Sequence, residues 1–229
     1  MKTKVSPIMK RLALSIIVAT AFLLAACGSD DGDFATRSGE SSSSENGTSP
    51  SSAASVQKST LTDSRDGKTY ATVEIGGRTW MAENLDFETE NSYCYEGVAA
   101  NCSKYGRLYT WSAAKLVCPE GWSLPTREDF EALFEEAGGK SVAGKALKSA
   151  SGWEKGVGTD DFGFSALPAG TKRYDDDLYS FEGCNTYFWT STEWGANSAY
   201  TMSLYCSSDG AELAFDKGDE GNSVRCVKD

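Results

Sequence analysis

The sequence predicts an α+β fold that has an antiparallel sheet and is held by disulfides. Three observations favour this class. Short helical patterns occupy the middle of the folded region, strand-like segments with turn signals dominate its last third, and six cysteines follow an export signal. Separate runs of helices and strands are typical of α+β proteins. An even cysteine count in an exported chain indicates a disulfide framework.

The chain begins with the features of an export signal. Basic residues precede an uncharged apolar stretch, residues 12–26, which is followed by Cys27. The stretch is shorter than the ~20 residues of a membrane span, and small residues stand where a signal peptidase cuts. The cysteine at the cut resembles the lipobox of bacterial lipoproteins, which implies removal of residues 1–26 and lipidation of Cys27, for example with palmitate. An ordinary signal peptide with a chance cysteine is the alternative.

Residues 27–60 are predicted to form the lipidated cysteine and a disordered tether. They are rich in Ser, Gly, Asp and Ala and have almost no large apolar side chains, so they cannot offset the entropy of ordering. Residues 28–33 are acidic and resemble the export tags of some surface lipoproteins, although a solvated linker fits equally well. We expect order to begin near Leu61 and the folded domain to cover residues 61–229.

The first predicted elements are a hairpin and short helices. Residues 69–75 and 78–81 read as two strands around Gly76-Gly77, which is typical of a β-hairpin. Residues 109–117 and 142–150 each predict a short helix.

The strongest helix signal covers residues 125–134. Thr126 and Asp129 have the spacing of a capping box, acidic residues in the first turns suit the helix dipole, and Gly138-Gly139 favours termination. Further strands are predicted at residues 187–191, 199–206, 211–215 and 223–227. An Asp-Gly turn signal separates the second and third of these.

Composition argues against several classes of function. The net charge is −11 and the chain has no histidine. A negative surface disfavours nucleic acids and anionic membrane faces as partners. Without histidine, Ser-His-Asp and Cys-His catalysis are excluded, and the commonest zinc ligand is missing. We therefore assign no catalytic residue, no cofactor and no metal ligand.

Six blocks of sequence carry a resemblance to a known family. They are residues 80–85 (Trp-Met-Ala-Glu-Asn-Leu), 105–111, 118–126, 161–170, 188–193 and 223–229. In content and order they resemble the Fibrobacter succinogenes major paralogous domain over about residues 61–229. Its members are commonly exported lipoproteins with a poorly defined biochemical role. The resemblance therefore implies a lipid-anchored protein of the outer membrane or cell surface.

The Leu-Pro-Thr segment before the strongest helix is also similar to a block of formylglycine-generating enzymes. This implies a C-type-lectin-like, formylglycine-generating-enzyme-like fold of short helices and a twisted antiparallel sheet. The catalytic role does not carry over, because the Arg-Gly-Gly-Ser-Trp block and the metal-binding cysteine pair of those enzymes have no match. The calcium motifs of C-type lectins are also absent from the sequence.

The six remaining cysteines allow fifteen connectivities, and sequence alone does not choose among them. The pairing that we expect is Cys94–Cys102, Cys118–Cys226 and Cys184–Cys206. The first would close a short Tyr-rich loop and the second would tie the helix segment to the last strand. The third joins the two cysteines left over, so it depends on the other two.

Ligand-binding candidates are aromatic residues in or near polar loop sequence: Trp194, Tyr174, Tyr179 and Tyr200. Exposed rings can stack on sugars or anchor a protein partner, whereas core packing is the alternative for each. The carboxylate groups at residues 159–161 and 175–177 could serve calcium. Neither has EF-hand spacing, and solvated loops of an acidic protein explain both.

These features lead to one main hypothesis. We expect a surface-exposed, lipid-anchored binding or adhesion module for carbohydrate or another surface protein, without catalysis. The alternatives are a degenerate formylglycine-generating-type or carbohydrate-active enzyme and a structural envelope lipoprotein.

Overall fold

The computed structural model describes residues 56–176 and 178–229. The predicted signal peptide 1–26, Cys27, most of the tether and Asp177 lie outside these residues. The tether boundary at residue 60 is wrong, because β1 (Lys58–Thr62) already pairs with the next strand. Nearly all of β1 is exposed. As an edge strand it is held by its backbone ladder, so it lacks the apolar alternation from which a strand is predicted.

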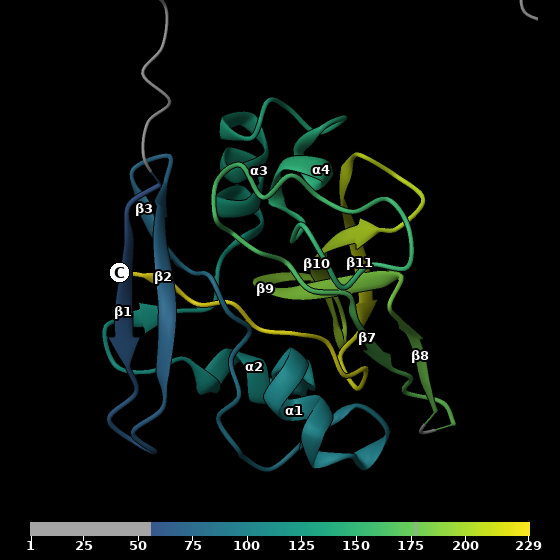
Figure 1. Ribbon diagram of the computed structural model, residues 1–229. Coiled ribbons are helices and arrows are strands. Elements are labelled where there is room, and N and C mark those ends of the chain that lie inside the picture. The colour runs from purple at the N-terminus through teal and green to yellow at the C-terminus, as the bar shows by residue number, and fades with distance from the viewer. Residues whose placement is uncertain (1–55, 177) are drawn as a thin grey trace, which may run out of the picture. The chain divides into compact units, whose positions relative to one another are not determined.

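The described domain is α+β, with two five-stranded sheets that are mostly antiparallel (Figure 1). The first sheet has the order β1-β2-β3-β12-β6 and adds β2 (Thr69–Ile75), β3 (Arg78–Met81), β6 (Trp122–Ser123) and β12 (Val227–Lys228). The second has the order β11-β10-β9-β7-β8 and contains β7 (Ala169–Lys172), β8 (Tyr179–Glu182), β9 (Asn185–Gly195), β10 (Ser198–Tyr205) and β11 (Ala211–Lys217). A separate pair consists of β4 (Ser92–Tyr93) and β5 (Leu108–Tyr109). Only β7 and β9 pair in parallel among the described strands.

The helices cover both faces of the second sheet (Figure 1). They are α1 (Ala99–Tyr105), α2 (Trp111–Val117), α3 (Arg127–Glu136) and α4 (Ala143–Leu147), with a short 3-10 turn at Tyr95–Gly97. Neighbouring residues of β9 point to opposite faces. Phe188 packs in the cluster of α3 and α4, and Trp189 packs in that of α2. None of the helices in the described ranges is long and apolar enough to cross a membrane.

Local sequence signals located several elements correctly. β2 and β3 form the expected hairpin around Gly76-Gly77, and β10 and β11 form the expected antiparallel pair. The capping box of α3 is confirmed. The amide of Asp129 donates to Thr126 Oγ1 over 3.1 Å, and the amide of Thr126 donates to the Asp129 carboxylate over 2.8 Å.

Other boundaries are corrected by the structure. The helix expected at residues 109–117 begins at Trp111, because Thr110 is its N-cap. The helix expected at 142–150 ends at Leu147, where Lys148 becomes extended. The last strand, expected at 223–227, is regular only at Val227–Lys228. The preceding residues cross between the two sheets and bond to each in turn: the Cys226 carbonyl accepts from Met81 of β3, and the Ser223 carbonyl accepts from Trp189 of β9.

The three disulfides are the expected pairs. Cys94–Cys102, Cys118–Cys226 and Cys184–Cys206 are all present. The second spans 108 residues and joins the end of α2 to the segment before β12. It therefore connects distant parts of the chain, whereas the first closes a separation of only 8 residues.

Candidate functional site

Trp194 lies on the second sheet, and its predicted loop position is wrong. The residue belongs to β9, which continues to Gly195. The Trp194 ring stacks on Phe215 of β11, with ring centroids 3.7 Å apart and an angle of 2° between the planes. Each side chain is 50% exposed. The register shift between β9 and β10 near Ala199 interrupts the regular ladder here, and such irregularities re-aim side chains.

Tyr200 extends this aromatic surface towards α3. It stands opposite Phe215 in the register of β10 and β11, so the two side chains share one face of the sheet. The Arg127 guanidinium lies over the Tyr200 ring, 4.9 Å from its centroid, and pairs with Glu131 at 2.7 Å. A cavity of 430 Å³ opens beside Tyr200, with Lys140 also in its lining. We call Trp194, Phe215 and Tyr200 the aromatic surface.

Tyr179 and Tyr174 do not belong to this surface. Tyr179 is half-buried in β8 and packs on Tyr95, with ring centroids 5.1 Å apart. Its ring therefore serves packing between β8 and the turn at residues 95–97. Tyr174 is 50% exposed in the turn between β7 and β8. It lines a different cavity, of 250 Å³, together with Asp216 and Glu220.

Two of the carboxylates that line this second cavity, Asp216 and Glu220, have raised pKa values. Burial raises the pKa of Asp216, against a hydrogen bond from Asn222 that lowers it. Burial, followed by the charges of Asp216 and Asp175, raises the pKa of Glu220 to about 7. Since the reference value is 4.5, the folded state holds this proton more tightly than the unfolded chain. The Glu220 carboxyl therefore lowers the free energy of unfolding as the pH rises from about 4.5 to about 7.

A further cavity, of 490 Å³, lies between the first sheet and α1. Two of its lysines already have acidic partners. Lys68 pairs with Asp86 at 2.7 Å, and Lys104 lies 3.6 Å from Glu182 and 4.3 Å from the Tyr105 ring centroid.

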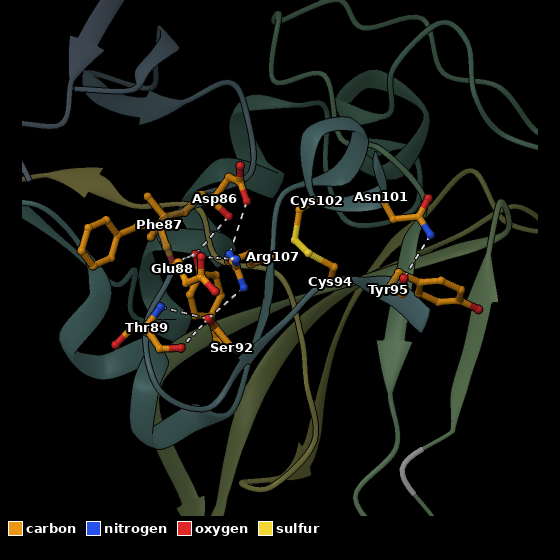
Figure 2. Close-up of a disulfide and its surroundings, with 12 residues drawn as sticks. Asp86, Phe87, Glu88, Thr89, Ser92, Cys94, Tyr95, Asn101, Cys102 and Arg107 are labelled. Atoms are coloured by element: carbon orange, nitrogen blue, oxygen red, sulfur yellow. Dashed lines mark hydrogen bonds and ion pairs between the residues drawn. A yellow bond between two sulfur atoms is a disulfide. The ribbon is translucent and has the colours of Figure 1, made fainter. Parts of the chain in front are cut away.

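A disulfide and an arginine cluster lie beside the cavity of 490 Å³. Figure 2 shows Cys94–Cys102 next to Asn101, whose side chain donates to the Tyr95 carbonyl over 3.0 Å. Away from the disulfide, Arg107 reaches Glu88 at 3.0 Å, and the Asp86 carboxylate lies 3.6 Å from its Nε. These contacts fix the loop around β4 and indicate a structural role.

The blocks that carry the family resemblance meet in the core around Arg225. Its side chain is fully buried and donates to Asn84 Oδ1 over 2.8 Å. It also donates to the backbone carbonyls of Phe164 and Ser165. Its guanidinium lies over the ring of Phe164 and near that of Phe188. Four of the six blocks are thus joined by one side chain.

The remaining blocks are linked by tryptophans and a disulfide. Trp189 Nε1 donates to the Tyr109 carbonyl over 2.7 Å, and Trp111 Nε1 donates to the Thr190 carbonyl over 2.9 Å. The block that begins at Cys118 is tied to the last block by its bond to Cys226. The shared motifs therefore specify the core, and function has to be sought on the surface.

The acidic clusters have local partners. Asp160 accepts from the backbone and hydroxyl of Ser165 at 2.7 and 2.6 Å. Asp175 and Asp176 pair with Arg173 at 3.0 and 3.3 Å. The described residues contain no group of three His, Cys, Asp or Glu that could hold a metal ion.

Sequence reasoning missed Phe215, Asp216 and Glu220. A signal for Phe215 exists: Leu213 and Phe215 alternate with charged or small residues, which predicts one shared face. Glu220 gives no such signal. It reaches the second cavity because Gly221 exchanges backbone hydrogen bonds with Lys172 of β7, at 2.8 and 2.9 Å.

Comparison with known proteins gives one match. The model of the Fibrobacter succinogenes major domain matches residues 73–228. No curated protein and no solved structure matches the chain.

Proposed function

The chain belongs to the Fibrobacter succinogenes major domain family, and on this premise we propose that it is a surface-exposed, lipid-anchored module that binds carbohydrate. The observation that carries the proposal is the stacked pair of Trp194 and Phe215, each half exposed. Large apolar rings are normally buried. Two of them stacked in solvent form a rigid plate of the kind that binding sites use.

The neighbourhood of the plate favours a sugar. Tyr200 and Leu213 continue its apolar area, while Arg127, Glu131 and Lys140 supply hydrogen-bonding groups beside the cavity of 430 Å³. Apolar walls with a few placed polar groups are typical of small-ligand sites. Both signs of charge are present, which suits a neutral, hydroxyl-rich ligand. A surface protein is the other partner that such a plate could anchor.

The family gives no activity, and the remaining parts of the proposal rest on the sequence. An acylated Cys27 would hold the protein at the outer membrane or cell surface, and residues 28–55 would separate the domain from the lipid. We propose a C-type-lectin-like topology for the domain, supported by its short helices, its antiparallel-rich sheets and the Leu-Pro-Thr segment before α3. We propose no catalysis.

Replacing Cys27 by Ser should abolish lipidation and leave an unacylated, unprocessed or mislocalised chain. The reason is that only the cysteine thiol can accept the lipid at this position. Detergent-phase partitioning of wild type and Cys27→Ser measures the effect, and Ser29→Ala serves as the neighbouring control. Equal partitioning of wild type and Cys27→Ser would contradict the anchor.

Replacing Trp194 by Ala should weaken ligand binding by more than about 1 kcal/mol, the size typical of an aromatic anchor. Folding should survive, because the ring is half exposed and an aromatic pair adds only about 0.5–1.5 kcal/mol. A glycan array with the full chain identifies the ligand, and titration of the best glycan measures the loss.

Two further variants sharpen this test. Phe215→Ala should weaken binding in the same direction, whereas Leu116→Ala, which removes an 84% exposed side chain on α2, should not. If Trp194→Ala binds glycans as wild type does, the aromatic surface is not the site. If no glycan binds but a surface protein does, the carbohydrate proposal fails.

A further inference from the structure

The cavity of 250 Å³ lies on the opposite face of the second sheet from the aromatic surface. Phe215 and Asp216 are neighbours on β11, so their side chains point to opposite faces. The cavity has two kinds of wall. Three of its residues are aromatic and three are carboxylates: Tyr174, Phe181, Tyr187, Asp175, Asp216 and Glu220. They come from β8, β9, β11 and the flanking loops.

The described lining of this cavity holds three carboxylates, Asp175, Asp216 and Glu220, against a single cation. Arg173 is the one cation among the described lining residues, and it is engaged by Asp175 and Asp176 at 3.0 and 3.3 Å. Asp216 accepts a hydrogen bond from Asn222 over 2.9 Å. In the part of the chain that the structure describes, neither Asp216 nor Glu220 is found in an ion pair with Lys or Arg.

Phe181 is held in a strained conformation at the edge of the cavity. Its φ is 69°, in the left-handed region that a bulky side chain rarely adopts. Its ring is nevertheless 55% exposed, so core packing does not explain the strain. Strained backbone is typical of ligand sites, and the strained residue here lines the same cavity as Asp216 and Glu220.

We propose that this cavity binds an alkylammonium group. Aromatic faces attract organic cations, and Asp216 and Glu220 supply the negative charge that such a cation requires. The volume lies below the roughly 300–1,000 Å³ of pockets that hold whole ligands, so the cavity fits a cationic head group. A quaternary head group and a lysine side chain share this chemistry. A divalent metal fits less well, because the described residues hold no group of three acidic or other metal-binding side chains.

Binding of the cation should depend on pH. The pKa of Glu220 is about 7, raised by burial, by Asp216 and by Asp175, with Arg173 acting in the opposite direction. The pKa of Tyr187 is raised to about 12 by burial, so this ring stays neutral. The negative charge at the site therefore grows between pH 6 and pH 8, and the affinity for a cation grows with it.

The test uses the full chain with two probes, tetramethylammonium and n-butylamine, each titrated at pH 5.5 and pH 8 by NMR of the aromatic protons. We expect saturable binding that is tighter at pH 8. Stronger binding of tetramethylammonium would identify a quaternary head group, and stronger binding of n-butylamine a lysine side chain. Glu220→Gln should weaken binding at pH 8 by about tenfold or more and flatten the pH dependence.

Three further variants distinguish binding in this cavity from a general effect of surface charge, from loss of folding, and from binding at the aromatic surface. Glu212→Gln removes one exposed charge from β11 outside the cavity and should bind as wild type does. Phe181→Gly should weaken binding while the melting temperature stays equal or rises, because glycine adopts positive φ without strain. Trp194→Ala should leave ammonium binding unchanged. The proposal is overturned if neither probe saturates, if neutral n-butanol binds as tightly, or if Glu220→Gln binds as wild type does.

Discussion

Replacing Cys118 and Cys226 together by alanine should lower the free energy of unfolding by up to about 4.7 kcal/mol. The bond closes a separation of 108 residues, and the entropy that a disulfide removes from the unfolded chain grows with the length of the loop. Cys226 is also fully buried in the cluster that contains Trp189 and Val224, so its loss removes packing as well. Chemical denaturation of wild type and the double variant measures the difference.

The matched control is the double variant Cys94→Ala with Cys102→Ala. This bond closes a separation of 8 residues, for which the same chain-entropy relation gives only about 2.5 kcal/mol. Removal of the Cys118–Cys226 bond should therefore lower the free energy of unfolding clearly more than removal of the Cys94–Cys102 bond. An equal or smaller loss for Cys118 and Cys226 would show that the unfolded chain keeps its two ends close without the bond.

Sequence signals that involve only neighbouring residues, such as turn and capping motifs, correctly predicted the elements in which they occur. The Gly76-Gly77 turn, the capping box of Thr126 and Asp129, and the β10–β11 hairpin all depend on neighbours in sequence. The three disulfide pairs were also expected, the first as closure of a short loop, the second as a link from the helix segment to the last strand, and the third as the pair left over. In contrast, β1 and the β7–β8 hairpin have no local apolar alternation, and their backbone ladders hold them: β1 pairs with β2, β8 pairs with β7, and β7 also pairs with β9.

The candidate sites depended on contacts that local patterns do not contain. Trp194 was chosen correctly as an exposed ring, but its polar neighbours suggested a loop and concealed that β9 continues to Gly195. Its partner Phe215 stands on another strand, and the stacking follows from the sheet order and from the bulge near Ala199. Glu220 comes near Asp216 because the next residue, Gly221, is hydrogen-bonded to Lys172 of β7, which is distant in sequence.

Replacing Arg225 by Met should lower the free energy of unfolding by about 3 kcal/mol or more. Burial lowers the pKa of Arg225 to about 9, so the side chain is still charged at pH 7. Methionine would remove the cost of burying that charge. It would also leave three buried acceptors without their donor, namely Asn84 Oδ1 and the carbonyls of Phe164 and Ser165.

Whether Arg225→Met raises or lowers the free energy of unfolding depends on which is larger, the removed cost of burying the charge or the loss of the three hydrogen bonds. A buried ion pair can be replaced by apolar residues at little cost when both partners are removed. Here two of the three acceptors are backbone carbonyls, which no substitution removes. Each unsatisfied buried acceptor costs about 1–3 kcal/mol, so the losses should exceed the gain. Urea denaturation of Arg225→Met, with Asn84→Ala and the double variant, measures the coupling through the one side-chain acceptor.

Arg225→Lys separates the charge from the geometry. One ammonium group cannot reach three acceptors that a planar guanidinium spans, so this variant should also be destabilised. Burial should lower the pKa of the new lysine, as it lowers the pKa of buried Lys148. A lowered pKa in the folded state means that the folded form prefers the neutral amine, so Arg225→Lys should regain stability as the pH rises towards 10, whereas Arg225→Met should not. A methionine variant within about 1 kcal/mol of wild type would mean that the three acceptors find other donors and that Arg225 does not join the motif blocks energetically.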